Sequence, residues 1–475
     1  MAYRKTVLAL SAATCMLLLS LMPAPAAAAR VERAAPVPAG AEPCSRWYLA
    51  EGSTDWGFDC YITIVNPNVF SVPVDITFMT TKGEVPLGST EVPAESQERI
   101  NPKEILGAAD FSTRVISLEG YPIAVDRYMS WTGQGARTRG AHSSIGVTGP
   151  AKRWYLPEGS SKWGFECWLL IQNPNPALAK CAITYMIEGA PPVTVNKEVP
   201  GNGRRSFFMA DDIGFNDASV MVESNVPVIP ERAMYRNNRR EGHDSIGTTA
   251  PATDYFLAEG TSGYGFTTYV LVQNPGKSEA NVTITYMTPE GPVPQPPFTM
   301  PPKSRKTIRV NDVLPGKDFS TQVHANVPII AERAMYWDNG TGEAMHDSIG
   351  LAGAHTRFFL PDGRSDAGSE TWTLVQNPNE SDVDIELTYF FNDGTAPTSF
   401  ALEIPGRSRR TFSMEDDIGQ GKYASVMVTS LAPEKRIMVE RAMYGQGRGS
   451  GADTIGGYVD SIGLAPFGAG VRRGR

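Results

Sequence analysis

Hydrophobic and polar residues alternate over short stretches of this chain, and turn residues separate the stretches. Residues 60–65 alternate and end at Asn66-Pro67-Asn68, and a second apolar stretch follows at 72–79. A period of two places apolar side chains on one face, as in a half-buried β-strand. Asn followed by Pro favours a type I turn, because proline fixes φ near the required value. The first hundred residues after Arg46 thus predict seven short strands: 47–49, 60–65, 72–79, 85–92, 97–100, 112–118 and 123–129.

The same pattern occurs four times. RWYLAEGSTDWGFDCYITIVNPN starts at Arg46, and related stretches start at Arg153, Asp254 and Arg357, so each opens a repeat of about a hundred residues. Seven strands in such a repeat predict an all-β fold of four tandem sandwiches of the immunoglobulin or fibronectin-III type. A propeller is the main alternative, but one four-stranded blade takes only about 40–50 residues. Short linkers between repeats predict an elongated array. The expected divisions are repeat 1 (46–150), repeat 2 (151–251), repeat 3 (252–354) and repeat 4 (355–466). Short helical turns are expected only at 104–109 and its counterparts.

The N-terminal segment has the features of a secretory signal peptide, expected at 1–29. Arg4 and Lys5 precede an apolar run, and small residues at 26–29 offer a cleavage site. A lipoprotein anchor at Cys15 is the alternative, but no aliphatic residue stands three positions before it. A flexible leader (30–45) and a C-terminal tail (467–475) flank the repeats, and no later apolar run is long enough to span a membrane. We therefore expect a secreted or cell-surface protein.

Composition narrows the classes of partner. The chain is 20% charged and 41% hydrophobic with a net charge of −8, as expected of a folded protein. A net negative charge disfavours nucleic-acid binding through phosphate contacts. No cofactor is predicted, and the expected partner is an unknown extracellular protein or a cell-envelope polysaccharide.

Four cysteines lie outside the signal segment, an even number in a chain expected to be exported. Cys167 and Cys181 lie symmetrically about Pro174, so a hairpin turn there would place them opposite each other. We predict disulfides between these two and between Cys44 and Cys60. The alternative is free buried thiols, because repeats 3 and 4 contain no cysteine.

Each repeat carries an adjacent acid and arginine on its last predicted strand, as in the Glu-Arg-Ala-Met-Tyr run that starts at Glu231. Successive side chains point to opposite faces, so one of the two charges turns inward and needs a partner. The acid after the first strand recurs once per repeat and is the expected partner. We predict structural ion pairs of Arg127 with Glu51, Arg232 with Glu158, Arg333 with Glu259, and Arg441 with Asp362.

A His-Asp-Ser-Ile-Gly motif closes repeats 2 and 3, at His243 and His346. The histidine is replaced by Val459 in repeat 4, and repeat 1 reads His142-Ser143-Ser144 with a serine in place of the aspartate, so no catalytic triad recurs. We expect a turn that precedes a core isoleucine. No catalytic residues are assigned, and the chain is not expected to be an enzyme.

Trp56 and Trp163 recur as Tyr264 but become Ala367 in repeat 4. Packing beneath a loop is the default interpretation, and an exposed platform for sugar rings is the alternative. Acidic pairs at Asp211-Asp212 and Asp416-Asp417 suit a helix start, and the rival is calcium binding between sandwiches. No metal site is assigned.

The opening Trp-Tyr-Leu-x-Glu-Gly, the Gln-Asn-Pro-Asn run and the closing Glu-Arg-Ala-Met-Tyr with Asp-Ser-Ile-Gly together resemble an uncharacterised repeat family of secreted and surface-attached bacterial proteins, notably actinobacterial ones. The resemblance covers nearly all of 46–466 and implies location and sandwich architecture only. The expected function is a non-catalytic structural spacer or adhesion scaffold. The alternative is an array of carbohydrate- or cell-wall-binding modules that use Trp56, Trp163 and Tyr264.

Overall fold

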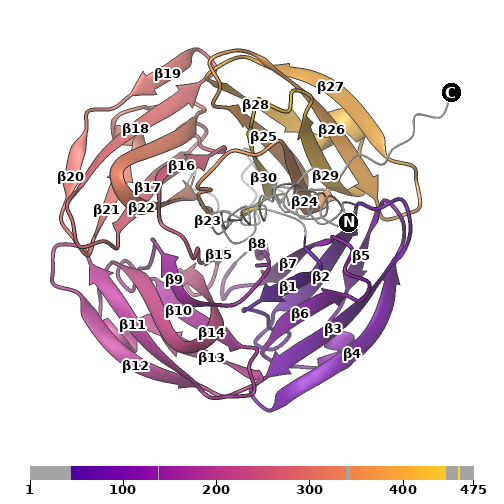
Figure 1. Cartoon of the computed structure of the whole chain (residues 1–475), viewed down its shortest axis with the longest axis horizontal. Coiled ribbons are helices and arrows are strands. Elements are labelled where there is room, and N and C mark those ends of the chain that lie inside the picture. Colours follow the sequence, from indigo (N-terminus) through magenta and orange to yellow (C-terminus); the bar gives the residue numbers. More distant parts are fainter. Residues whose placement is uncertain (1–43, 137–138, 339–342, 367, 446–457, 461–475) are drawn as a thin grey trace, which may run out of the picture. The chain divides into compact units, whose positions relative to one another are not determined.

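Strands make up nearly all of the regular structure, as the alternating pattern predicts (Figure 1). The structure is a computed structural model that describes residues 44–136, 139–338, 343–366, 368–445 and 458–460. In this part of the chain, no helix has the length and apolar character needed to traverse a lipid bilayer.

Repeat 1 consists of two four-stranded antiparallel sheets with a hydrophobic core between them. Sheet A has the order β1-β6-β3-β4, and sheet B has the order β5-β2-β7-β8. The elements are β1 (Arg46–Leu49), β2 (Asp59–Asn66), β3 (Val72–Thr80), β4 (Gly83–Val92), β5 (Ser96–Ile100), α2 (Lys103–Leu106), β6 (Phe111–Ser117), β7 (Ala124–Trp131) and β8 (Gly140–Ile145).

Repeats 2 and 3 have the same two sheets, but one long strand replaces the separate sixth and seventh strands. This strand starts in sheet A and continues in sheet B. Repeat 2 contains β9 (Ala151–Leu156), β10 (Glu166–Asn173), β11 (Ala179–Ile187), β12 (Val193–Val199), β13 (Gly203–Phe208), α3 (Met209–Ile213), β14 (Ala218–Arg236) and β15 (Glu241–Ile246). Repeat 3 contains β16 (Ala252–Leu257), β17 (Phe266–Asn274), β18 (Ala280–Thr288), β19 (Gly291–Pro294), β20 (Phe298–Met300), β21 (Ser304–Arg309), η1 (Val310–Asp312), β22 (Ser320–Asp338) and β23 (Glu343–Ile349).

Repeat 4 returns to eight strands in two sheets of four. Its elements are β24 (Arg357–Arg364), β25 (Glu370–Asn377), β26 (Val383–Phe391), β27 (Thr398–Ile404), β28 (Ser408–Ser413), α4 (Met414–Ile418), β29 (Tyr423–Ser430), β30 (Met438–Tyr444) and β31 (Tyr458–Asp460). The helical turns lie where the sequence predicts them.

The recurring Asn-Pro pair joins the two sheets of a repeat. The side-chain nitrogen of buried Asn173 donates to the carbonyls of Ala177, Val199 and Pro200, and its oxygen accepts from the backbone of Asn175. Asn66, Asn274 and Asn377 make the equivalent bonds in the other repeats. A buried amide must be satisfied in this way, which explains why the motif recurs.

The order of strands differs from the predicted immunoglobulin-type sandwich, in which the first strand pairs with the second. Here β1 pairs with β6, and β2 belongs to the other sheet. The predicted turn at the His-Asp-Ser-Ile motif is also wrong. It is an eighth strand, because its backbone pairs along β14 in repeat 2 and along β22 in repeat 3.

The repeats form a closed ring rather than the predicted elongated array (Figure 1). Sheet B of each repeat packs on sheet A of the preceding one, so that Gln172 Nε2 of repeat 2 donates to the Thr113 carbonyl of repeat 1 at 3.3 Å. Repeat 1 continues the series against repeat 4, where Gln97 Oε1 accepts from the backbone N–H of Asp362 at 3.3 Å. The eighth strands β8, β15, β23 and β31 meet in turn around the centre of the ring. Short linkers restrict relative movement, but they do not decide between a rod and a circle.

Candidate functional site: the inter-repeat interfaces

Four fully buried arginines, one per repeat, connect the ring from repeat to repeat. They are Arg127, Arg232, Arg333 and Arg441, each at most 1% exposed. Each contacts a carboxylate of the next repeat. The contacts are Arg127 Nη1 to Glu231 Oε1 at 2.7 Å, Arg232 Nη1 to Glu332 Oε1 at 3.4 Å, Arg333 Nη1 to Glu440 Oε2 at 3.1 Å, and Arg441 Nη2 to Asp126 Oδ2 at 2.8 Å.

The adjacent acid and arginine explain how one strand serves two interfaces. On β14, Glu231 points towards repeat 1 and Arg232 towards repeat 3, because successive side chains alternate between faces. Both are buried, since both faces of the strand are covered. Such a head-to-tail contact closes into a ring when the rotation between neighbours allows it.

The structure brings together three of the four predicted pairs. Arg127 lies 3.4 Å from Glu51, Arg232 lies 3.4 Å from Glu158, and Arg333 lies 3.1 Å from Glu259, measured between nitrogen and carboxylate oxygen. In repeat 4, Arg441 Nη1 instead donates to the backbone carbonyl of Asp362 at 2.8 Å, and the Asp362 carboxylate bonds to Arg364 at 3.2 Å. The sequence did not predict that the next repeat also supplies an acid to each arginine, namely Glu231, Glu332, Glu440 and Asp126.

Buried histidines extend this network at the interfaces between repeats 1 and 2 and between repeats 2 and 3. His142 Nδ1 lies 2.7 Å from Asp244, and His243 Nδ1 lies 3.0 Å from Asp347 of the following repeat. Burial lowers the pKa of His243 to about 4 and that of His346 to about 3. The rings of His243 and His346 are therefore neutral at pH 7 and act as hydrogen-bonding groups.

The donor set Glu51, His142 and Asp244 has the residue types of a metal site, and Glu158, His243 and Asp347 repeat it. However, Arg127 bonds to Asp244 and lies 3.4 Å from Glu51, so a guanidinium already supplies the positive charge there. A second cation beside it would be repelled. One acid of each acidic pair bonds within its own repeat: Asp212 accepts from Tyr185, and Asp417 accepts from Tyr389.

The predicted disulfides are wrong, because Cys44, Cys60, Cys167 and Cys181 are all free thiols. Cys167 lies on β10 in sheet B and Cys181 on β11 in sheet A, so the Asn173-Pro174 turn crosses between sheets and does not form a hairpin. Burial raises the pKa of Cys60 and Cys167 to about 12.

Three pockets open where consecutive repeats meet, with cavity volumes of about 280 Å³ (pocket 1–2), 640 Å³ (pocket 2–3) and 590 Å³ (pocket 3–4). Each takes an acid, an exposed aromatic and an aspartate from the earlier repeat, and a second aromatic, an arginine and a tyrosine from the later one. In pocket 3–4 these residues are Glu259, Tyr264, Asp318, Trp372, Arg409 and Tyr444. Pocket 1–2 has Glu51, Trp56, Asp110, Trp168, Arg204 and Tyr235, and pocket 2–3 has Glu158, Trp163, Asp217, Tyr269, Arg305 and Tyr336.

The rim aromatics do not pack beneath a loop, which corrects the default interpretation. Trp56, Trp163 and Tyr264 are 70%, 74% and 73% exposed. Each has a left-handed backbone with φ between 54° and 58°, followed by a glycine that also has positive φ. Bulky residues rarely adopt this conformation, so an exposed ring held in it three times points to function rather than packing.

The interface between repeats 4 and 1, called the closing interface, has different residues at the same positions. Tyr423 replaces the pocket aspartate, since it pairs with Arg364 as Asp217 pairs with Ser160. Gln97 replaces the pocket arginine, and Ser130 replaces the pocket tyrosine. Tyr128, two residues earlier on β7, lies between two guanidinium groups, with Arg364 4.3 Å and Arg99 5.6 Å from its ring centroid. Stacked cations and tyrosines occupy this interface.

A family model described as a family of unknown function (DUF5719) matches residues 239–328. No curated protein matches the chain. Among solved structures, the chain is similar to Thermotoga maritima 1070, with 18% identity over 21% of this chain and 94% of that one and a TM-score of 0.21. It is also similar to the Anabaena sensory rhodopsin transducer, with 28% identity over 18% of this chain and 95% of that one and a TM-score of 0.16. A tetra-tandem repeat from the extending region of a large adhesion protein matches at 11% identity over 84% of this chain and 93% of that one, with a TM-score of 0.10.

Proposed function

We propose that this chain is a non-catalytic secreted or cell-surface protein whose ring binds polysaccharide through the three inter-repeat pockets. The supporting observation is the exposed aromatic ring at each rim, fixed by a turn in which Phe58 N–H donates to the Asp55 carbonyl at 2.9 Å. Exposing a large ring forgoes the stabilisation that its burial would give. The exposed face of an aromatic ring can stack on the apolar face of a sugar ring.

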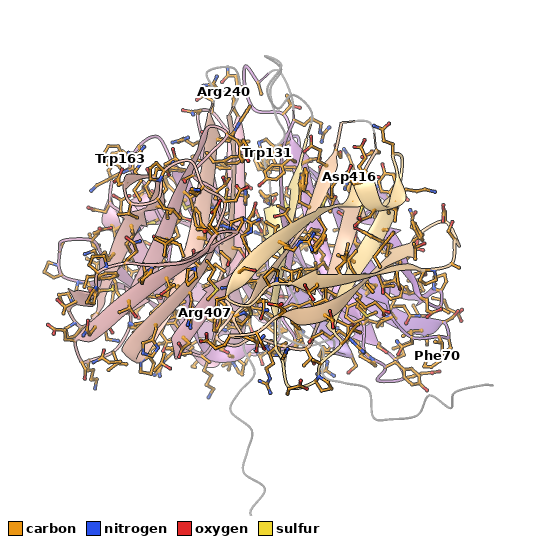
Figure 2. All side chains as sticks on the ribbon, turned by 90° about the horizontal axis from the view of Figure 1, so that it is seen from above. Phe70, Trp131, Trp163, Arg240, Arg407 and Asp416 are labelled. Atoms are coloured by element: carbon orange, nitrogen blue, oxygen red, sulfur yellow. The ribbon has the colours of Figure 1, made fainter. Side chains whose placement is uncertain are left out.

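The pockets open on one face of the ring. Figure 2 shows Trp163 on the face opposite to Phe70 and Arg407. Trp56 and Tyr264 occupy the position equivalent to Trp163 in neighbouring repeats, so the three pocket openings share that face. Sites on one face can engage one polymer together, which raises the overall affinity without new contacts.

The simple spacer or adhesion scaffold remains the rival proposal. A spacer needs length, and the contact of Arg441 with Asp126 joins the two end repeats. An adhesion role through a protein partner predicts no dependence on the pocket aromatics.

Retention on immobilised envelope polysaccharides tests the proposal. Wild type should be retained, and the triple variant Trp56→Ala, Trp163→Ala, Tyr264→Ala should lose retention by about tenfold or more, because each stacked ring contributes about 0.5–1.5 kcal/mol. The matched control replaces three exposed apolar residues outside the pockets, Val69, Leu118 and Leu431, by alanine and should bind as wild type does. Absence of wild-type retention on every polysaccharide would reject sugar binding and favour the scaffold. Equal retention of the triple variant would reject the aromatic sites.

A further inference from the structure

Each pocket contains acids and arginines in nearly equal number. Pocket 1–2 is lined by two acids and two arginines, pocket 2–3 by three of each, and pocket 3–4 by two acids and one arginine. A pocket that selects a charged ligand has an excess of the opposite charge. These linings lack such an excess.

The buried charges of the pockets are also already paired. In pocket 3–4, Arg409 Nη1 donates to the carbonyls of Gly260 and Phe319 at 3.0 and 3.2 Å, and Nη2 donates to Thr411. Glu259 Oε1 accepts from Tyr444 at 2.7 Å, and Oε2 lies 3.1 Å from Arg333. The arginine and the glutamate therefore have little bonding capacity left for an ionic ligand.

The pocket aspartates are less buried and have fewer partners than these groups. Asp110, Asp217 and Asp318 are half-buried and line the three pockets next to the rim aromatics. Trp56 Nε1 donates to Asp110 at 3.4 Å, and Asp217 accepts from Ser160 at 2.6 Å and lies 3.8 Å from Lys162 Nζ. A carboxylate has about four acceptor positions, so each of the two keeps some of them open. A carboxylate with free acceptor positions beside an aromatic face suits adjacent hydroxyl groups, which are donors on an uncharged ring.

We infer that each pocket binds one uncharged pyranose residue, stacked on the rim aromatic and held by hydroxyl donation to Asp110, Asp217 or Asp318. This inference rests on the proposed function and adds the class of sugar. Cavities of 590 and 640 Å³ lie within the usual range for small-ligand sites, and the 280 Å³ of pocket 1–2 lies at its lower edge. The closing interface, which has Tyr423 in place of the aspartate, should bind no sugar.

Titration with soluble probes tests the inference, with neutral gluco- and N-acetylglucosamine oligomers compared with galacturonate oligomers by calorimetry and tryptophan fluorescence. We expect a neutral oligomer to bind at up to three sites per chain, with a Kd that changes less than about twofold between low and high salt, since screening acts on charged pairs. Preference for the galacturonate oligomer, with binding weakened by salt, would overturn the inference but leave the proposed function intact. Failure of every probe together with failure of polysaccharide retention would reject both.

A single-pocket variant decides the role of the aspartate. In a chain that carries Trp56→Ala and Trp163→Ala, only pocket 3–4 keeps its rim aromatic. Asp318→Asn should weaken binding of a neutral oligomer about tenfold, because an amide loses half of the acceptor capacity of a carboxylate. With an acidic ligand the same change should strengthen binding, because it removes a like charge. The matched control is Tyr423→Phe at the equivalent position of the closing interface, which should leave binding unchanged. Unchanged or tighter binding in Asp318→Asn would overturn the inference.

Discussion

The three copied interfaces and the closing interface have the same geometry but different chemistry. Between repeats 2 and 3, Arg232 lies among Glu158, Glu332 and Asp347, with His243 alongside. At the closing interface Arg441 contacts Asp126, and Ser143 Oγ lies 3.2 Å away at the position that Asp244 and Asp347 occupy in the interfaces between repeats 1 and 2 and between repeats 2 and 3. One buried arginine per junction is therefore kept, while the groups around it differ.

This difference separates ring closure from ligand binding. The arginine and its acid are present at all four junctions, so they hold the ring together. The rim aromatic, the pocket aspartate and the tyrosine occur together only at the three copied junctions. The closing interface has stacked Arg99, Tyr128 and Arg364 instead. Pocket residues absent from a junction that still closes are not needed for closure, which supports a separate role for them.

Arg232→Met should have the largest effect on stability. It leaves Glu158, Glu332 and Asp347 buried without their cation, and breaking a buried ion pair on one side costs about 3–5 kcal/mol. The free energy of unfolding from urea titration measures this loss. Arg153→Met, which breaks a largely exposed pair with Glu223, is the control and should cost less than about 1 kcal/mol. Equal losses in the two variants would show that the buried arginines do not hold the ring.

Contacts within a repeat could be predicted from the sequence, whereas contacts between repeats could not. The period of about a hundred residues and the alternation along residues 60–65 predict four all-β repeats, and the inward arginine predicts a local acid near Arg127, Arg232 and Arg333. Ring closure was not predictable in this way, because the same period suits a rod or a circle. Partners such as Glu231 for Arg127 lie on another repeat.

One signal could have revealed the ring. The strand with Glu231 and Arg232 has charge on both faces, and the Glu-Gly-His-Asp-Ser-Ile stretch beside it is too polar for an ordinary core strand. Polar strands that are buried on both faces need partners on both sides, so each repeat must have a neighbour on each side. Only a ring gives every repeat two neighbours.

The second expected effect is on the pH dependence of stability, and it concerns a histidine that repeat 4 lacks, because its motif has Val459 where repeats 2 and 3 have His243 and His346. Burial lowers the pKa of His243 to about 4 in the folded state, below the ordinary value near 6.5. The unfolded chain therefore takes up the proton first, and this contribution to stability is lost as pH falls from 6.5 towards 4. Between pH 7 and pH 4.5 the wild type should lose about 2–3 kcal/mol more than His243→Gln.

Urea titrations of wild type and His243→Gln at pH 7 and pH 4.5 measure this difference. Subtracting one loss of stability from the other removes the contributions of titrating groups that both proteins share. His324→Gln is the control, because the His324 side chain is 56% exposed. Parallel losses in wild type and His243→Gln would contradict a buried neutral histidine.

A third and smaller effect is expected at the closing interface. Arg99→Met keeps the apolar part of the side chain but removes the guanidinium stacked 3.9 Å from the Tyr61 ring centroid, so it should cost about 1 kcal/mol. Lys306→Met, which removes a cation 4.5 Å from the Phe298 ring within repeat 3, is the matched control and should cost about 0.5 kcal/mol. A loss from Arg99→Met as large as that from Arg232→Met would show that the stacked cations hold the closing interface as firmly as the buried arginines hold the others.

The smallest expected effect is that of a reductant, which should leave the melting temperature unchanged. One predicted disulfide joins Cys44 of the leader to Cys60 of repeat 1, the other lies within repeat 2, and all four thiols are free in the structure. In a chain that starts at Arg30, thiol titration after unfolding should count four cysteines without prior reduction. In the folded protein Cys60, Cys167 and Cys181 should react slowly at pH 8, because burial raises their pKa to about 12, 12 and 11 and leaves little thiolate. Fewer than four thiols, together with a fall in melting temperature on reduction, would restore the disulfides, since closing loops of this size contributes about 3 kcal/mol. Repeats 1 and 2 would then be stabilised by disulfides that repeats 3 and 4 lack. The three copied interfaces would in that case join repeats that differ in stability.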